Sequence, residues 1–389
     1  MKPRGQATDA VWAGEEDRLL TGATVVPVSL GVAHGYPDVE SWQAVALGHA
    51  PGHIYARNTN PTVDAFEQKL RALERADDAT SFSTGMAAIS NTMFALLKPG
   101  DRVVSVKDTY GGTNQMFLHT LPQWGVEVAL CDTADTDAIE AAIATGCAVL
   151  YLETPTNPTL KVTPIARLAA AARAAGAVVV VDNTAATPVN QHPLALGADL
   201  VIHSATKYLG GHADAMGGAL CGRRDLVRAV FHHREITGAS LDPMSAYLLL
   251  RGMKTLNLRI ERQNASALLI ARWLERHPRV SQVNYPGLDS HPHHETAAGQ
   301  MRGFGGLLSF ALRDGFDEVT RVLPRLHLMH RAANLGSVET VGGPPATTSH
   351  VECSREERAV MGIPEGLIRY SVGIEAVDDL IADLAQALG

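Results

Sequence analysis

The sequence contains few cysteines, few aromatic residues and no long apolar run. Its four cysteines are scattered without a Cys-x-x-Cys pair, so neither a disulfide framework nor a zinc site is expected, and a reducing cytoplasm is the expected location. The most apolar stretch, residues 177–181, is far too short to span a bilayer. Residues 1–22 are polar and lack the pattern of a signal peptide, which argues against secretion.

Positive charge is not in excess either. The 389 residues include 33 Lys and Arg against 41 Asp and Glu, for a net charge of −8. Neither nucleic acid nor an anionic membrane is therefore an expected partner. What the chain does have is a hydrophobic content of 46% beside 19% charged residues. That composition is typical of a soluble globular protein, and the length predicts two or more domains.

Short apolar runs alternate with Ala-rich helical patterns between about residues 61 and 225. This alternation is typical of a mostly parallel sheet with helices on both faces. Residues 62–70, which follow the Asn60-Pro61 turn, and residues 165–175 predict helices. The predicted strands are residues 102–106, 126–130, 148–152, 177–181 and 200–202.

The same patterns divide the chain into an arm and two domains. Residues 1–60 are rich in Gly, Pro and Thr and predict an extended arm with short helices. Residues 61–250 predict the large sheet domain. A long helical pattern at 245–276 leads into a smaller C-terminal α/β domain, residues 251–389. The strand candidates of that domain are residues 307–312 and 368–372.

Two of the predicted strands are followed by charged residues that could take part in catalysis. Asp182 follows residues 177–181, and Lys207 follows residues 200–202 after a short polar turn. Ligands of open parallel sheets bind beyond the carboxyl ends of the strands. If the two strands are neighbours, the acid and the amine suit pyridoxal 5′-phosphate (PLP), which needs a protonated ring nitrogen and an amine of lowered pKa. Taken singly, an N-cap acid and a surface lysine are the commoner explanations.

Other residues could hold the phosphate and the ring of such a cofactor. Residues 81–88 combine small hydroxyl side chains with Gly85 and the start of a helical pattern, which together suit a phosphate. Ser204 and Thr206 could add further hydroxyl groups. Tyr110 lies in a glycine-rich turn and could stack on the ring. Taken alone, residues 81–88 are more typical of an ordinary capped helix start, and Tyr110 is compatible with a partly buried loop tyrosine.

Taken together, the motifs resemble the cystathionine γ-lyase/cystathionine γ-synthase group, the Cys/Met-metabolism branch of fold-type-I PLP enzymes. The resemblance runs from about residue 15 to the C-terminus, with the motifs in the order that the family has them. The matching stretches are Tyr55-Ala56-Arg57, Asn60-Pro61-Thr62, Ser83-Thr84-Gly85-Met86, Asp108-Thr109-Tyr110-Gly111-Gly112-Thr113, Glu153-Thr154-Pro155-Thr156-Asn157-Pro158, Asp182-Asn183-Thr184, Ser204-Ala205-Thr206-Lys207-Tyr208 and residues 368–375.

The resemblance implies a role for each matching residue on the cofactor side. Lys207 would form the Schiff base and shuttle protons, and Asp182 would face the ring nitrogen. Tyr110 would stack on the ring and assist departure of the leaving group. The implied cofactor-binding residues are Lys207, Asp182, Thr184, Tyr110, Gly85, Met86, Ser204 and Thr206, with Tyr55 and Arg57 contributed by a neighbouring subunit.

The implied fold is that of a fold-type-I PLP-dependent transferase. Residues 61–250 would be the PLP-binding large domain with a seven-stranded type of sheet, and residues 251–389 the small domain. The arm, residues 1–60, would contact a neighbouring subunit, where Tyr55 and Arg57 would reach the phosphate. The assembly would be a homotetramer, a dimer of dimers, and the partner of the protein a small amino-acid substrate.

On the substrate side, the resemblance implies that Arg369 grips the carboxylate through its planar fork. Asn157 would lie near the 3′-oxygen of PLP and the same carboxylate. Glu339 stands where γ-type enzymes often carry an acid and β-lyases an aromatic residue, which favours γ chemistry. The implied substrate-binding residues are Arg369, Asn157, Asn334, Glu339 and Tyr55.

The chain departs from the family pattern mainly on this substrate side. Asn334 replaces the usual serine, and residues 347–352 replace a Met-Thr-His-Ala run. Gly112 stands where methionine γ-lyases usually carry cysteine. We therefore expect γ-elimination or γ-replacement on a γ-substituted L-amino acid, as in a cystathionine γ-lyase that releases 2-oxobutanoate and ammonia, with a shifted preference for the γ-substituent.

Alternatives remain open at this point. A cystathionine γ-synthase, an O-acetylhomoserine sulfhydrylase, a methionine γ-lyase and a specialised γ-lyase share the motifs. An aminotransferase fits them less well, and a non-catalytic module of the same fold would not need the Lys207–Asp182 pair. The run His291-Pro292-His293-His294 predicts a polar loop rather than a metal site, because the proline interrupts any helical face.

Overall fold

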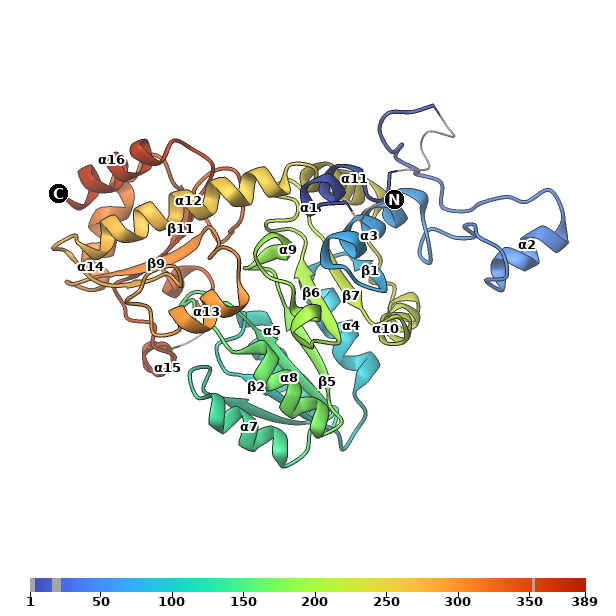
Figure 1. Cartoon of the computed structure of the whole chain (residues 1–389), viewed down its shortest axis with the longest axis horizontal. Helices are drawn as coiled ribbons and strands as arrows, with labels where there is room; N and C mark the ends of the chain where they lie inside the picture. Colours follow the sequence, from blue (N-terminus) through green and yellow to red (C-terminus); the bar gives the residue numbers. More distant parts are fainter. Residues whose placement is uncertain (1–3, 16–21, 352–353) are drawn as a thin grey trace.

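The computed structural model describes residues 4–15, 22–351 and 354–389. Residues 1–3 and 16–21 of the predicted arm lie outside the described residues, as do Glu352 and Cys353. The rest forms a large and a smaller β-sheet, and the long helix α12, Leu256–Glu275, runs from one toward the other (Figure 1).

Within the described residues the large sheet has seven strands in the order β1-β7-β6-β5-β4-β2-β3. β2 to β6 pair in parallel, whereas β7 runs antiparallel to β1 and to β6. The prediction of a mostly parallel seven-stranded sheet is confirmed. The strands are β1 (Asp78–Phe82), β2 (Arg102–Val106), β3 (Glu127–Cys131), β4 (Val149–Glu153), β5 (Val178–Asp182), β6 (Leu200–Ser204) and β7 (Gly218–Gly222).

Helices surround this sheet and continue into the C-terminal part of the chain. Those of the first half are α1 (Gln6–Trp12), α2 (Val39–Ala46), α3 (Pro61–Glu74), α4 (Gly85–Leu96), α5 (Gly111–Gln115), α6 (Leu121–Gln123), α7 (Thr136–Ala144) and α8 (Ile165–Ala174). The others are α9 (Thr187–Asn190), α10 (Arg224–Thr237), α11 (Pro243–Met253), α12, α13 (His294–Gln300), α14 (Phe316–Val322), α15 (Arg355–Val360) and α16 (Val377–Leu388).

The central strands β4 and β5 are mostly apolar because both faces of the sheet are covered. Helices α4 and α10 lie on one face, and α7 and α8 lie on the other (Figure 1). Along β5, Val180 packs into the core on the α4 side, whereas Val179 and Val181 pack with Leu168 of α8. Burial on both faces explains why these strands show no alternation of apolar and polar residues.

The predicted strand positions were close but not complete. β2 matches its prediction, and β3, β4 and β5 each start and end one residue later. β1 and β7 were missed, because their sequences Asp-Ala-Thr-Ser-Phe and Gly-Ala-Leu-Cys-Gly carry few residues that favour strands. They form by pairing with each other over Asp78–Gly222 to Phe82–Gly218.

The prediction of one helix over residues 245–276 was wrong. The chain forms α11 and α12, with a break at Lys254-Thr255. At the break, the carbonyl of Gly252 accepts a hydrogen bond of 2.9 Å from the buried Arg259 guanidinium. That guanidinium also donates to the carbonyls of Tyr208 at 2.8 Å and Leu209 at 3.3 Å. Arg259 therefore fixes the turn that follows Lys207 against both helices.

The smaller sheet has the order β10-β11-β12-β9-β8 among the described residues and packs against α12, α14 and α16. β9 matches its prediction, and β12 lies one residue earlier than predicted. Its strands are β8 (Val280–Asn284), β9 (Leu307–Leu312), β10 (His330–Arg331), β11 (Val341–Gly343) and β12 (Leu367–Ser371).

The N-terminal residues divide into a packed part and an extended part. α1 packs on α3, where the buried Lys69 ammonium pairs with Glu15 at 2.8 Å. The segment with α2 projects away from the body of the molecule (Figure 1). It leaves large apolar side chains in contact with solvent, including Val39 at 71% and Trp42 at 52% exposure. None of the helices in the described part of the chain is long and apolar enough to cross a membrane.

Arg259→Lys should destabilise the protein. A lysine cannot reach the separate carbonyls that the planar guanidinium bridges, so we expect a loss of about 2 kcal/mol in the free energy of unfolding. Urea denaturation followed by circular dichroism measures this. Arg262→Lys is the control, because Arg262 is exposed and donates only to the carbonyl of Glu375 at 3.0 Å; it should change stability by less than about 0.5 kcal/mol. Equal losses in both variants would contradict the role of Arg259.

Candidate active site

The carboxyl ends of β4, β5 and β6 meet at one edge of the large sheet. Glu153 pairs with Asp182, and Asp182 pairs with Ile202. Lys207 lies in the turn that follows β6. The expectation that Asp182 and Lys207 follow neighbouring parallel strands is thus confirmed. This is the edge at which open parallel sheets bind their ligands.

Asp182 is buried and held by hydroxyl and amide donors. Its carboxylate accepts from the amide of Thr184 at 2.9 Å and from the Tyr151 hydroxyl at 3.3 Å. Burial raises the pKa of Asp182, while the Thr184 hydrogen bonds and the nearby His203 act in the opposite direction. His203 itself contacts buried Glu74 at 2.6 Å. A carboxylate supported in this way can hold a proton on a ring nitrogen.

The Lys207 amine is largely buried and has a defined partner. Its Nζ donates to Oδ1 of Asn334 at 2.8 Å. Burial, and then the positive charge of Arg369, lower the pKa of Lys207 to about 8. About one tenth of this lysine is therefore a neutral amine at pH 7, far more than for an ordinary lysine, and the neutral form is the one that acts as a nucleophile or a base.

Arg369 lies on β12 with only 3% of its surface exposed. Its Nη2 donates to the carbonyl of Asn334 at 2.8 Å, while its Nε is buried without a partner among the described residues. Asn157 Oδ1 is likewise buried and unpaired there. Such groups are costly unless a ligand satisfies them. A guanidinium with a free donor beside a lysine suits the carboxylate of an amino acid.

A cradle for a phosphate lies at the start of α4. Thr84 caps this helix by accepting from the amide of Ala87 at 3.0 Å, which leaves the amides of Gly85 and Met86 available to a ligand. A Cβ at Gly85 would lie 2.8 Å from the Cβ of Ser204. The Thr206 hydroxyl is engaged with Gly217, donating to its carbonyl at 3.2 Å and accepting from its amide at 3.0 Å.

Tyr110 stands in the loop between β2 and α5 with its ring half exposed. Its amide donates to Glu153 at 2.7 Å. Burial, and then the charge of Asp182, raise the pKa of Glu153 well above its usual range. Behind the ring, a Cβ at Gly112 would lie 3.0 Å from both Met86 Sδ and a ring carbon of Tyr110. The loop therefore sits tightly over the start of α4.

Three residues that the sequence assigned to the site are not joined to it. Tyr55 and Arg57 lie in the extended N-terminal part, where the guanidinium stacks 5.6 Å from the Tyr55 ring and donates to the carbonyl of Glu235. Glu339 is exposed. Within the described residues, no hydrogen bond or ion pair connects these side chains to Lys207, and their roles stay predictions.

Sequence reasoning gave no role to the groups that support the site from behind. Glu153 was recognised only as part of a motif, although its place at the end of a strand next to Asp182 could have singled it out. Tyr151, and the pair of Glu74 with His203, approach Asp182 from distant parts of the chain. No spacing in the sequence indicates those contacts.

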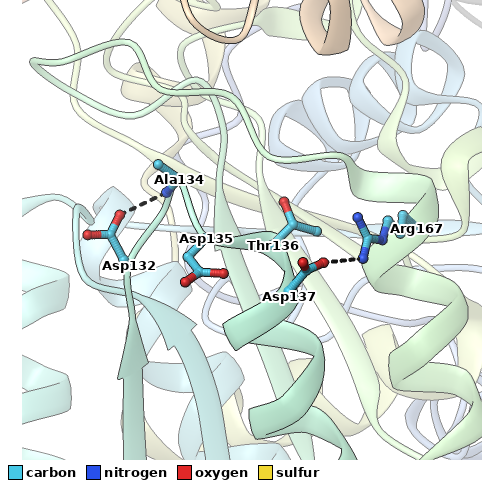
Figure 2. A pocket seen from close by; sticks show the side chains of 6 residues that line it. All are labelled: Asp132, Ala134, Asp135, Thr136, Asp137 and Arg167. Carbon is cyan, nitrogen blue, oxygen red and sulfur yellow. Dashed lines mark hydrogen bonds and ion pairs between the residues drawn. The ribbon is translucent and has the colours of Figure 1, made fainter.

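A surface hollow lies away from these residues. Its volume is about 580 Å³, and it opens between the turn after β3 and the helices α7 and α8 (Figure 2). Arg167 pairs with Asp137 across it at 2.6 Å, and Asp132 accepts from the amide of Ala134 at 2.9 Å. None of the candidate cofactor or substrate residues lines this hollow.

Comparison with known proteins agrees with this geometry. The family described as Cys/Met metabolism PLP-dependent enzyme matches residues 7–389. The chain belongs to this family. It is 42% identical to an L-methionine γ-lyase of Pseudomonas putida, covering 99% of this chain and 97% of that one. It is also 42% identical to a cystathionine γ-lyase of Bacillus subtilis, covering 95% of both.

A solved cystathionine γ-synthase of Xanthomonas oryzae pv. oryzae superimposes on the chain with a TM-score of 0.94. It is 36% identical, and the match covers 100% of this chain and 98% of that one. The fold-type-I architecture and PLP dependence of this Cys/Met-metabolism protein therefore agree with the sequence interpretation.

The residues present fit PLP. The tight cradle at Gly85 would hold a phosphate, Asp182 would meet the ring nitrogen, and Lys207 would bond the aldehyde carbon. The unpaired buried atoms of Asn157 and Arg369 leave donors and acceptors for the cofactor and the substrate. When bound, PLP supplies an electron sink for a carbanion at the substrate's Cα.

Gly85→Ala should weaken PLP binding. The added Cβ would collide with Ser204, so the cradle must widen, at a cost of about 1–3 kcal/mol. We expect an affinity for PLP at least about tenfold lower, measured by titrating the PLP-free protein and following tryptophan fluorescence.

Gly299→Ala is the matched control, because a Cβ at this helical glycine meets nothing within 4 Å. It should bind PLP like the wild type. Unchanged affinity in Gly85→Ala would show that the start of α4 does not hold the phosphate.

Proposed function

We propose that the protein carries out PLP-dependent γ-elimination on a γ-substituted L-amino acid, in the manner of a cystathionine γ-lyase, releasing 2-oxobutanoate and ammonia. The observation that carries the proposal is the state of the Lys207 amine. Its pKa is lowered, it donates a hydrogen bond to Asn334, and the buried Arg369 guanidinium contacts the same asparagine. A base of this kind next to a carboxylate clamp suits proton removal from the Cα of an amino acid.

The side chains divide the work. Arg369 binds the α-carboxylate and fixes Cα with respect to Lys207. Lys207, in its neutral form, would remove the proton from Cα and pass it on to the bound cofactor. Neutral again, it would remove a second proton from Cβ, so that the substituent can leave from Cγ. Tyr110, whose ring is half exposed in the loop after β2, would donate a proton to the leaving group. The buried surroundings exclude water from these steps.

Two points support a reaction in which the substituent leaves from Cγ: the presence of Glu339 and the activities named for the relatives. The P. putida and B. subtilis proteins are named as γ-lyases, and the X. oryzae structure as a γ-synthase. Gly112 argues against methionine as the substrate to which the site is adapted. A larger side chain there would press on Met86 and the Tyr110 ring. Cystathionine, an O-acyl-homoserine or an amino acid with another heteroatom at Cγ remain the substrates that we propose.

γ-Replacement is the second candidate function, as in a cystathionine γ-synthase or a homoserine sulfhydrylase. The close superposition on a γ-synthase favours it. The two reactions share every step up to departure of the γ-substituent, so the same residues serve both.

The domain division and the assembly belong to the same proposal. We place the cofactor-binding domain at residues 61–250, the small domain at 251–389 and a subunit-contacting arm at 1–60. The exposed apolar side chains of the α2 segment support an arm that is covered by another copy. We propose a cytoplasmic homotetramer in which Tyr55 and Arg57 complete the site of a neighbouring subunit.

The proposed reaction is tested by incubating purified protein and PLP with a panel of substrates. Cystathionine and O-acyl-homoserines should yield 2-oxobutanoate and ammonia, and added cysteine or sulfide would reveal replacement. Lys207→Ala should lower kcat by a factor of at least about 10³, because the base and cofactor anchor are lost.

Lys98→Ala, at an exposed lysine just after the end of α4, should keep full activity. Turnover of β-substituted substrates such as cystine alone would overturn the γ assignment. Full activity in Lys207→Ala would overturn the proposed function as a whole.

The shared site is tested by mixing two inactive variants, Lys207→Ala and Arg57→Ala, after reversible dissociation. If each site takes its lysine from one copy and Arg57 from the other, mixed dimers contain one intact site. Random pairing should restore about one quarter of the wild-type activity. If mass spectrometry verifies the mixed dimers and the mixture still recovers no activity, both residues belong to the site of one subunit.

A further inference from the structure

Asn334 is a position at which this chain departs from the family pattern, and it is in direct contact with the Lys207 amine. One residue here contacts both groups that the proposed mechanism uses: its side-chain oxygen accepts from Lys207 Nζ at 2.8 Å, and its backbone carbonyl accepts from Arg369 Nη2 at 2.8 Å. We propose that Asn334 is a positioning residue that sets the balance between the ammonium and amine forms of Lys207 and couples it to the carboxylate clamp. This inference rests on the proposed function.

The chemistry of the amide gives the direction of the effect. A carboxamide oxygen only accepts hydrogen bonds, and it meets a Lys207 nitrogen that donates. A serine hydroxyl, the usual residue of the family at this position, can accept from the ammonium or donate to the neutral amine. Asn334 therefore favours the charged form of Lys207 more than serine would, since a hydrogen bond to the charged form stabilises it.

The backbone around Asn334 holds the amide in place. Gly336 has a φ of +81°, and a Cβ there would lie 2.7 Å from the amide of Tyr208, the residue after Lys207. The amide of Gly336 donates to the Ser371 hydroxyl at 2.9 Å. The loop is thus pinned between the turn that carries Lys207 and the strand that carries Arg369, so Asn334 has little freedom to move away.

Opposing influences act on the same lysine. Burial and the charge of Arg369 on β12 favour the neutral amine. Arg369 in turn interacts electrostatically with Tyr208 and with Tyr110, from the loop after β2. Asp182 ends the strand beside β6. The Asn334 oxygen opposes the first two influences. A substrate carboxylate that neutralises Arg369 would shift this balance toward the ammonium, the form that results when Lys207 takes a proton from Cα.

The test measures the protonation of Lys207 without cofactor or substrate. PLP-free protein is labelled briefly with acetic anhydride at a series of pH values, and mass spectrometry gives the extent of acetylation at Lys207. Because only the neutral amine reacts, Asn334→Ala should move the midpoint to a pH about one unit lower. Asn334→Ser should give a smaller move in the same direction, and Asn334→Asp should move it about one unit or more higher.

Ala333→Ser, at an exposed neighbour in the same loop, is the control and should leave the midpoint unchanged. In the PLP-bound enzyme, the acidic limb of the pH profile of kcat, which reports groups of the substrate complex in which Lys207 acts as a free base, should move in the same order as the labelling midpoints. Midpoints that coincide in the wild type, Asn334→Ser and Asn334→Asp would overturn the inference while leaving γ-elimination intact. Loss of the proposed function would instead show in the substrate panel, with the labelling shifts still present.

Discussion

The parallel pairing of β5 with β6 is the constraint on which the site depends. The registers Val181–Val201 and Asp182–Ile202 bring the ends of both strands to one edge of the sheet. The strands themselves are apolar and buried on both faces, so a polar group can be tolerated only where they end. An acid at the end of one strand and an amine just beyond its neighbour are the consequence. The cofactor would lie where the covered sheet opens.

Burial then adjusts the charged groups in opposite directions. Desolvation disfavours the charged form, so it raises the pKa of Asp182 and Glu153 and lowers that of Lys207. None of these shifts is a gain in stability, because a buried charge with an incomplete set of partners is costly. Other buried contacts stabilise the surrounding structure. Arg259 bridges the carbonyls of Tyr208 and Gly252, and Lys69 forms an ion pair with Glu15.

The sequence predicted most of the large sheet and the cofactor side of the site, because these depend on local patterns. Apolar runs mark β2 and β9, and Asp182 and Lys207 directly follow such runs. It could not predict β1 and β7, which have weak strand propensity and form by pairing, or the break at Lys254-Thr255, which depends on the tertiary contact of Arg259. The contact of Asn334 with Lys207 spans 127 positions, so no local pattern could have indicated it.

The two sides of the site come from different parts of the chain. The groups proposed to hold the cofactor stand on the large sheet and its turns, whereas the proposed substrate clamp stands on β12 and the loop before β11. Asn334 joins the two sides, because its side chain reaches the base while its backbone holds the clamp. A change of residue at this position would therefore act directly on the proton affinity of the lysine, whereas the backbone carbonyl that Arg369 contacts is present in every residue. Under the proposed function, a residue change in this one loop would thus shift the pH range in which the enzyme works.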